Sequence, residues 1–272
     1  MGNISIVKLG GSIITDKKGR RPLLRIRRIR EIAREVARIR SKDPNLHLIL
    51  LHGAGSFGHP LAYRYKLMGQ PLSKETLVGV GYTTSAVREL GNLLSKAFLD
   101  AGVPVVPLQT SSFTCMRRGR LHFNDLSVLR IILKNGGIPL LGGDVVFSEF
   151  GKTAIASADG LAVALAKKFK PARLFFASDT NGVYATFPPR VGEWPLSSMD
   201  RAAVRNLLRT QRVRATPTDV TGAMLGKLRA LLDMRGTTVT IFNGNVRGAV
   251  AGVLSRKKRG TEEYSCGLSE LL

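Results

Sequence analysis

Short runs of hydrophobic residues alternate along the chain with longer amphipathic stretches. Residues 4–9, 47–51 and 138–141 form compact runs rich in Ile, Leu and Val, the pattern of strands buried on both faces. Residues 74–101 and 159–169 instead carry Ala and Leu at helical spacing. The first half of the chain is therefore expected to alternate strands with helices.

The second half continues this alternation. Strands are expected at residues 103–106, 173–177 and 238–242, helices at 199–209 and 224–234, and a hairpin or lid at 114–124. Alternating strands and helices predict an α/β fold, a three-layer αβα sandwich around a central, mainly parallel sheet. We expect one domain over residues 1–272, divided into one lobe at 1–170 and another at 171–272.

Glycine-rich turns follow four of the expected strands, at residues 10–11, 53–58, 142–143 and 243–248. In a parallel sheet these turns meet at one edge, where ligands bind beyond the carboxyl ends of the strands. The turns therefore predict a ligand site at that edge.

The chain is strongly basic, with 42 Lys and Arg against 19 Asp and Glu and a formal net charge of +23. The densest basic segment, residues 20–40, interleaves its arginines with Ile, Ala and Val at helical spacing, which predicts an amphipathic helix with a solvated arginine face. We interpret the charge as a basic surface on a protein with an anionic substrate. A nucleic-acid partner is the alternative, although no aromatic-rich basic motif accompanies the charge.

The cysteines and the lengths of the apolar runs indicate the cellular compartment and the solubility that we expect for the protein. Cys115 and Cys266 form no metal-ligand pattern, and a disulfide between them is the alternative to the reducing cytoplasm that we expect. The apolar runs are far shorter than the ~20 residues of a membrane span, and the N-terminus has no targeting pattern, so a soluble protein is expected.

Two turns have the composition of phosphate-binding loops. In Lys8-Leu9-Gly10-Gly11-Ser12, glycines leave room for phosphate oxygens to approach backbone N–H groups, and a lysine stands beside them. In the segment 52–59, His-Gly-Ala-Gly-Ser-Phe-Gly-His, three glycines precede a helix, and His59 ends the turn where a ring N–H could donate to a phosphate. Each pattern alone also fits an ordinary tight turn.

Two later segments complete the set. Ser178-Asp179-Thr180-Asn181-Gly182-Val183-Tyr184 follows a strand and by itself indicates only a turn. Residues 219–227, Asp-Val-Thr-Gly-Ala-Met-Leu-Gly-Lys, open a helix with Lys227 in its first turns. A lysine opposes the helix dipole there, and an anionic ligand would explain it.

In this order and spacing, KLGGS, SDTNGVY and DVTGAMLGK resemble the amino acid kinase superfamily. The segments 8–17 and 52–60, Lys17 and His59 included, are most similar to the isopentenyl phosphate kinases of the alternative archaeal mevalonate route. The resemblance covers nearly the whole chain. It implies a homodimer that transfers a phosphoryl group from ATP, with Mg²⁺ bridging the ATP phosphates and no protein metal site, to isopentenyl phosphate.

The resemblance also implies roles for individual residues. Lys8 and Lys227 would hold the β- and γ-phosphates, Lys17 would neutralise charge on the transferring group, and Asp159 would orient the lysines. The nucleotide would lie against Lys8, Gly10, Gly11, Ser12, Gly55, Asp179, Tyr184, Gly222 and Lys227, and the acceptor against Ala54, His59 and Ala158. Ala54 and Ala158 stand where the family commonly has glycine, which leaves the fine substrate preference open.

An apolar acceptor would also need a slot, for which residues 62–84 supply Leu67, Met68, Leu72, Leu77, Val78, Val80 and Tyr82, although any of these could equally be core. Other acidic acceptors are open alternatives: a phosphonate, a nucleoside monophosphate or an acylated amino acid. A basic, nucleic-acid-binding regulator on a kinase-like fold is the alternative from another class. A regulator would not need Lys8, Lys17, Asp159 and Lys227 together.

Overall fold

A computed structural model describes residues 4–16, 22–171, 173–186, 189–210, 223–232, 234, 236–255 and 268–271 of the 272-residue chain. Among the residues singled out in the sequence, Lys17, residues 219–222 (Gly222 included) and Cys266 lie outside these ranges. Among the described helices, none combines the length and the apolar content that crossing a membrane requires.

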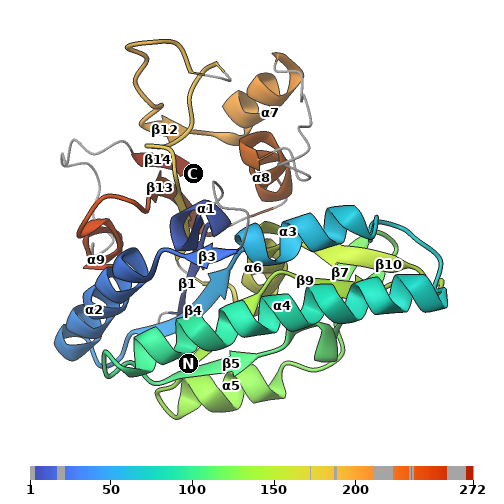
Figure 1. Cartoon of the computed structure of the whole chain (residues 1–272). Coiled ribbons are helices and arrows are strands. Elements are labelled where there is room, and N and C mark those ends of the chain that lie inside the picture. Colours follow the sequence, from blue (N-terminus) through green and yellow to red (C-terminus); the bar gives the residue numbers. More distant parts are fainter. Residues whose placement is uncertain are drawn as a thin grey trace.

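An eight-stranded sheet runs through the middle of the molecule in the order β12-β14-β13-β11-β1-β4-β8-β5 (Figure 1). The six strands from β13 to β5 run parallel, and β14 pairs antiparallel with β13. The strands are β1 Ile4–Leu9, β4 His47–His52, β5 Val105–Leu108, β8 Ile138–Gly142, β11 Arg173–Ser178, β12 Ser198–Met199, β13 Thr238–Asn243 and β14 Leu268–Leu271. The predicted, mainly parallel sheet is confirmed.

Helices cover both faces of this sheet, as the sandwich requires. One layer contains α2 (Ile26–Lys42), α4 (Lys74–Leu99) and α9 (Ala249–Ser255), whose buried side chains share one core. The other contains α5 (Ser127–Lys134), α6 (Ala158–Phe169), α7 (Arg201–Thr210) and α8 (Ala223–Leu231), which share a second core. In Figure 1, α2 and α4 lie in front of the strands and α6 behind them.

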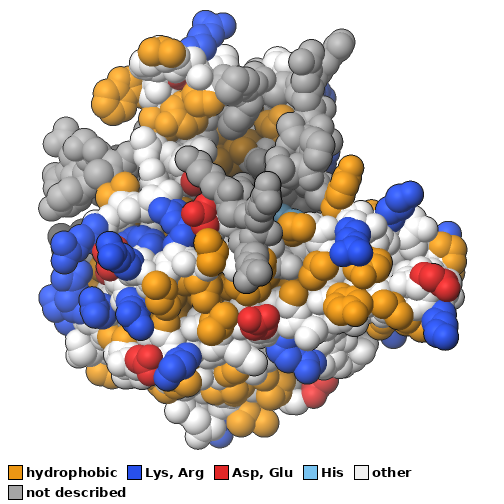
Figure 2. All heavy atoms as spheres, viewed as in Figure 1, with side chains coloured by type: hydrophobic (Ala, Val, Ile, Leu, Met, Phe, Trp, Pro, Cys, Tyr) orange, Lys and Arg blue, Asp and Glu red, His pale blue; other side chains and the backbone are white. Residues whose placement is uncertain are grey.

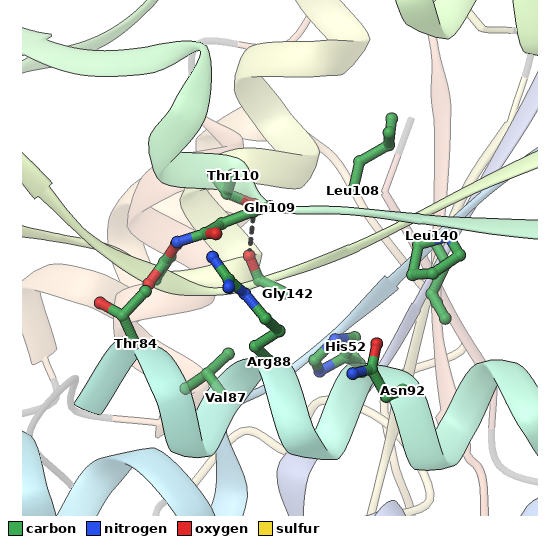
Figure 3. Close-up of a pocket in the computed structure, with 13 residues that line it drawn as sticks. His52, Thr84, Val87, Arg88, Asn92, Leu108, Gln109, Thr110, Leu140 and Gly142 are labelled. Carbon is green, nitrogen blue, oxygen red and sulfur yellow. Dashed lines mark hydrogen bonds between the residues drawn. The ribbon is translucent and has the colours of Figure 1, made fainter. Parts of the chain in front are cut away.

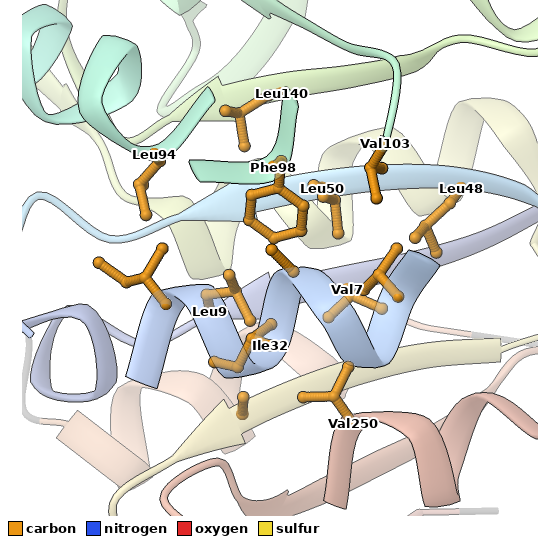
Figure 4. Close-up of a cluster of buried hydrophobic side chains, with 14 of the residues drawn as sticks. Val7, Leu9, Ile32, Leu48, Leu50, Leu94, Phe98, Val103, Leu140 and Val250 are labelled. Atoms are coloured by element: carbon orange, nitrogen blue, oxygen red, sulfur yellow. The ribbon is translucent and has the colours of Figure 1, made fainter. Parts of the chain in front are cut away.

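Alternation along β1 decides which way its side chains point. Val7 and Leu9 join the core under α2, shown in Figure 4, whereas Ile4 and Ile6 join the core under α6 and α8. Lys8 has the same parity as Ile4 and Ile6, so it points to the α6 side at the carboxyl end of the strand. The core thereby fixes the direction of a charged side chain.

Small hairpins and short helices lie near the carboxyl ends of the parallel strands. The expected hairpin at residues 114–124 is confirmed as β6 (Thr114–Arg117) and β7 (Arg120–Phe123). A second hairpin, β9 (Asp144–Phe147) with β10 (Thr153–Ala156), was not predicted. The remaining elements are α1 Gly11–Ile14, β2 Thr15–Asp16, β3 Leu23–Leu24, α3 Gly55–Arg64 and a 3-10 turn at Thr110–Ser112.

The prediction that the arginines of α2 form a solvated face is wrong for Arg28 and in part for Arg40, which is half-buried and donates to the Gly136 carbonyl at 2.7 Å. Basic side chains do gather over α2 in Figure 2, but Arg28 is buried and forms an ion pair with buried Glu35, at 3.1 Å. Arg28 donates to the carbonyls of Gly244 and Val246, and Glu35 accepts from backbone N–H groups of Gly248 and Ala251. The pair therefore ties α2 to the loop after β13.

Replacement of Arg28 by Met should lower the free energy of unfolding by about 3 kcal/mol, because it leaves a buried carboxylate without its cation and two carbonyls without donors. Urea denaturation measures this loss. The control is Arg34→Met, which removes an exposed arginine of the same helix and should change stability by less than about 0.5 kcal/mol. Equal stability of the two variants would contradict the structural role of the pair.

Candidate active site

Two lysines and one carboxylate meet at the carboxyl end of β1. Lys8 Nζ lies 2.7 Å from Asp159 Oδ1, and Lys227 Nζ lies 3.0 Å from Asp159 Oδ2. The three residues come from β1, α6 and α8, far apart in the sequence. The structure thus brings together three of the four residues that the sequence predicts as catalytic, the fourth being Lys17.

Local structure holds each member in place. Asp159 lies in the first turn of α6, whose N-cap residue Ser157 accepts the backbone N–H of Gly160 at 3.0 Å. A carboxylate in a first turn is favoured by the helix dipole. Lys227 is buried on α8, and its Nζ lies 5.0 Å from the centre of the Phe176 ring.

Burial and charge act in opposite directions in this cluster. Burial alone would raise the pKa of Asp159, but Lys8 and, after it, Lys227 hold the pKa of this carboxyl far below its usual range. Burial, together with repulsion from Lys8, lowers the pKa of Lys227, while Asp159 opposes the shift. One carboxylate thus compensates two nearby cations, and the cluster keeps an excess of positive charge.

Two glycine-rich turns pack directly against one another beside this cluster. A side chain at Gly11 would place its Cβ 2.7 Å from the Cα of Gly55, which is closer than real Cβ contacts allow. Gly55 itself has φ +51°, a left-handed conformation that glycine adopts without strain. The hydroxyl of Thr15 accepts the N–H of Ser56 at 3.1 Å and joins the turns further. These glycines are therefore required by close packing of the two loops.

A cavity of about 500 Å³ opens from the lysine cluster. Lys8, Gly11 and Asp159 line its polar end, and the loop residue Ala54 and His59 of α3 line its side. Much of the remaining wall is apolar and is formed by Leu67, Met68, Val87, Val145 and Ile155, with the polar side chains of Lys66, Gln70, Thr83 and Asp144 among them. A ligand that fills the cavity would meet the ammonium group of Lys8 and a largely hydrocarbon wall.

The predicted apolar slot is only partly correct. Leu67 and Met68 line the cavity, but Leu72, Leu77, Val78 and Tyr82 are exposed and Val80 is not among its lining residues. The reason is the helical period of α4, which turns Thr83 and Val87, one turn apart, towards the cavity. Val145 and Ile155 were missed because the β9–β10 hairpin was missed. Its signal was two short apolar runs around the glycine-containing turn at 148–152.

The backbone accommodates alanine at positions 54 and 158, where the family commonly has glycine. Ala54 has a right-handed helical conformation, φ −71° and ψ −23°, and Ala158 begins α6, so neither position requires glycine. Both side chains line the cavity, where each adds a methyl group to the wall. The departures therefore narrow the cavity without disturbing the fold.

A hydrogen-bonded network connects the loops on the other side of the cluster. Arg25 donates from Nη1 to the Ser12 carbonyl at 2.9 Å and to Asn245 Oδ1 at 2.6 Å. Asn243 donates to Asn181 Oδ1 at 2.7 Å and accepts from the N–H of Asn245 at 2.9 Å. The network thus joins the ends of β1, β11 and β13, and sequence patterns gave no sign of it.

The two residues expected near the nucleoside differ in exposure. Asp179 is exposed and close enough to Lys227 to favour its charged form and oppose the lowering of its pKa. Tyr184 is buried.

The ends of strands β1 and β11 also meet closely. A Cβ atom at Gly10 would lie 2.8 Å from the carbonyl oxygen of Ala177, so no side chain fits there unless this carbonyl moves.

Mg²⁺ finds no ready side-chain site in the described part of the chain. No group of three His, Cys, Asp or Glu residues there is arranged to hold a metal ion, and Asp159 already gives one oxygen to each lysine. The described residues therefore supply no ready side-chain site for Mg²⁺, and we assign no step to the ion.

Comparisons with known proteins identify the family to which this chain belongs. The sequence model of the amino acid kinase family matches residues 3–243, and the chain belongs to this family.

Within that family, the chain falls among the isopentenyl phosphate kinases. It is 32% identical to the isopentenyl phosphate kinase of Methanothermobacter thermautotrophicus, covering 94% of this chain and 97% of the relative. The enzyme of the same name from Methanocaldococcus jannaschii is 27% identical over 95% of this chain and 98% of its own. A crystal structure of an isopentenyl phosphate kinase superimposes with a TM-score of 0.77 at 29% identity, covering 92% of this chain and 96% of its own.

Replacement of Asp159 by Asn should destabilise the ligand-free protein by at least about 2 kcal/mol near neutral pH, because two lysines lose their shared counter-ion. The folded-state pKa of Asp159 is depressed, so its stabilisation is complete above the unfolded value of about 3.9 and is lost as the pH falls towards the folded value. Urea denaturation at several pH values should therefore show a stability difference that is constant above about pH 5 and shrinks below about pH 4.

The control is Asp100→Asn, which removes a carboxylate from an exposed pair with Lys96 and should cost under about 1 kcal/mol. A difference between the unaltered protein and Asp159→Asn that does not shrink in acid would show that the loss is not electrostatic.

Proposed function

We propose that this protein transfers the γ-phosphoryl group of ATP to isopentenyl phosphate and produces isopentenyl diphosphate, a step of an alternative mevalonate route. The observation that carries the proposal is a cavity that reaches Lys8 and Asp159 of the lysine cluster and has a largely apolar remaining wall. A short isoprenoid phosphate has this same polarity. The similarity to isopentenyl phosphate kinases along nearly their whole length supports the same acceptor.

The chemistry requires charge neutralisation more than a base. A phosphate oxygen of the acceptor attacks the γ-phosphorus, the bond from that phosphorus to the β–γ bridging oxygen breaks, and ADP leaves. The attacking oxygen is already anionic, so no general base is needed. Lys8 and Lys227 would hold the ATP phosphates and stabilise the charge between two anions. Asp159 would position both ammonium groups by its two ion pairs.

His59 would hold the acceptor phosphate. It lies on α3, lines the cavity and comes four residues after Gly55, whose turn leads into the helix. Ala54 and Ala158 would contact the acceptor from the same walls. This arrangement would hold the phosphate of the acceptor while the apolar tail of the acceptor occupies the slot beyond it.

The remaining assignments stay predictions from the resemblance. They are the catalytic role of Lys17, the nucleotide contacts of Gly10, Gly11, Ser12, Gly55, Asp179, Tyr184 and Gly222, the use of Mg²⁺, and a cytoplasmic location. The close packing of the glycine loops and the Arg25 network support a nucleotide site at the strand ends.

The predicted division into two lobes and the predicted homodimer each have separate support. Strands β11 to β14 lie on one side of β1, and β4, β8 and β5 lie on the other, which supports an acceptor lobe at 1–170 and a nucleotide lobe at 171–272. Leu77, Val78 and Tyr82 expose apolar surface along α4, which supports a homodimer that covers it.

A coupled ADP-release assay over a panel of acceptors tests the proposal. Isopentenyl phosphate should be turned over with the highest kcat/KM, and acetylglutamate, uridylate and a small phosphonate should be poor acceptors because none places hydrocarbon in the slot. Preferred turnover of one of these three would replace the proposed acceptor. No ADP release with any acceptor would favour a regulatory protein.

Replacement of His59 by Ala should raise the KM for the acceptor about 10- to 150-fold, the scale of one hydrogen bond to a charged group, and leave the KM for ATP nearly unchanged. Steady-state kinetics against each substrate measures both constants. His59→Gln keeps an N–H donor and should recover part of the loss. The exposed His122 provides a control, since His122→Ala should alter neither constant.

If His59→Ala instead raises the KM for ATP and spares the acceptor, the two substrates have been placed on the wrong sides of the cavity.

A further inference from the structure

A second cavity, of about 280 Å³, lies between the middle of α4 and the ends of β5 and β8 (Figure 3). Neither lysine of the cluster lines it, so it is distinct from the candidate active site. The two cavities nevertheless share two wall residues, Val87 on α4 and Asp144 at the start of β9. A molecule bound in the second cavity would therefore touch residues that also shape the first.

The α4 wall of this cavity carries a polar stripe. Thr84, Arg88 and Asn92 recur at intervals of four residues and so lie on one face of the helix. In Figure 3, Arg88 and Asn92 extend from the helix towards the cavity. Over the described ranges, neither Arg88 nor Asn92 forms a hydrogen bond or ion pair with another residue. Both side chains are exposed, and a guanidinium beside an amide is a donor set for a carboxylate or phosphate.

The facing wall offers hydrogen-bond acceptors. The Nδ1 atom of His52 lies 3.2 Å from the Gly53 carbonyl, which can only accept, so Nδ1 carries the hydrogen. Burial lowers the pKa of His52 to about 4, and the neutral ring therefore keeps a lone pair on Nε2 near pH 7. This atom faces α4 at Gly91, where a Cβ would lie only 3.2 Å away.

Asp144 adds a carboxylate to the acceptors. It is buried and accepts the backbone N–H groups of Ser111 and Val145, at 3.1 and 2.8 Å. Burial raises the pKa of the Asp144 carboxyl. In either protonation state an oxygen of this carboxyl can accept from a ligand hydroxyl. The cavity thus presents donors at one wall and acceptors at the other, and the net charge of +23 attracts anions to it.

We propose that the second cavity binds a small hydroxylated anion, a carboxylic acid or phosphate monoester with at least one hydroxyl group. Its anionic group lies on Arg88 and Asn92, and its hydroxyl donates to His52 Nε2 or to Asp144. Because Val87 and Asp144 belong to both cavities, occupancy of this site alters acceptor binding in the first. The binding site itself does not depend on which acceptor the first cavity takes.

Calorimetric titration of the full chain tests this site with two probes, sn-glycerol 3-phosphate and D-glycerate. Saturating isopentenyl phosphate and a non-hydrolysable ATP analogue are present, so that the lysine cluster is occupied. At least one probe should bind to a single site. Arg88→Gln should weaken that binding about tenfold or more, as expected for the loss of a charged hydrogen-bond donor.

The matched control is Lys96→Gln, which removes the same charge from the same helix outside the cavity and should leave the affinity within about twofold. Failure of both probes to bind would overturn the proposal, as would equal losses in the two variants, which indicate attraction by net charge alone. Methyl phosphate that binds as tightly as sn-glycerol 3-phosphate would overturn the assignment of the hydroxyl to His52 or Asp144.

Failure of the proposed function can be distinguished from failure of this proposal. Isopentenyl phosphate and the ATP analogue are titrated first, and if the proposed function is wrong, isopentenyl phosphate will not bind. In that case the titrations without them, compared between Arg88→Gln and Lys96→Gln, still decide whether the second site exists.

Discussion

The repulsion between two nearby ammonium groups is the constraint on which the site depends. Lys8 and Lys227 are both buried, and each would be costly to keep charged if Asp159 did not lie between them. One carboxylate cannot cancel two cations, and the exposed Asp179 only partly favours the charged form of Lys227, so the cluster retains positive charge. The fold therefore carries a local electrostatic cost in its ligand-free state, which bound phosphates would relieve under the proposed function.

The rest of the architecture can be understood as support for this cluster. Apolar neighbours of alternating parity in β1 fix the direction of Lys8, and the capped first turn of α6 fixes Asp159. Arg25 connects the loop after β1 to the loop after β13, and the Arg28–Glu35 pair anchors that second loop to α2. Basic residues that look like surface charge in the sequence thus hold the strand ends in register around the cluster.

Sequence periodicity predicted the sandwich because strands buried on both faces and helices buried on one have distinct patterns. Local patterns also drew attention to Lys8, beside a glycine turn, and to Lys227, at a helix opening, whereas Asp159 was predicted only from the family resemblance. It could not show that Arg28 is buried, because an arginine on a helix has the same local pattern whether its partner is water or Glu35. Likewise, the roles of Val145 and Ile155 depend on how a short hairpin folds over α4, which is a tertiary property.

Selectivity for the acceptor has to arise away from the lysines. Their charge attracts every anionic acceptor and therefore cannot distinguish a phosphate on a sugar from a phosphate on a hydrocarbon. The apolar slot can do so, since burial of each methylene contributes about 0.8 kcal/mol. A five-carbon tail then gains about 4 kcal/mol, roughly a thousandfold in affinity. Under the proposed function, discrimination between acceptors would fall to Leu67, Val87, Val145 and Ile155, and the reaction itself to the lysines.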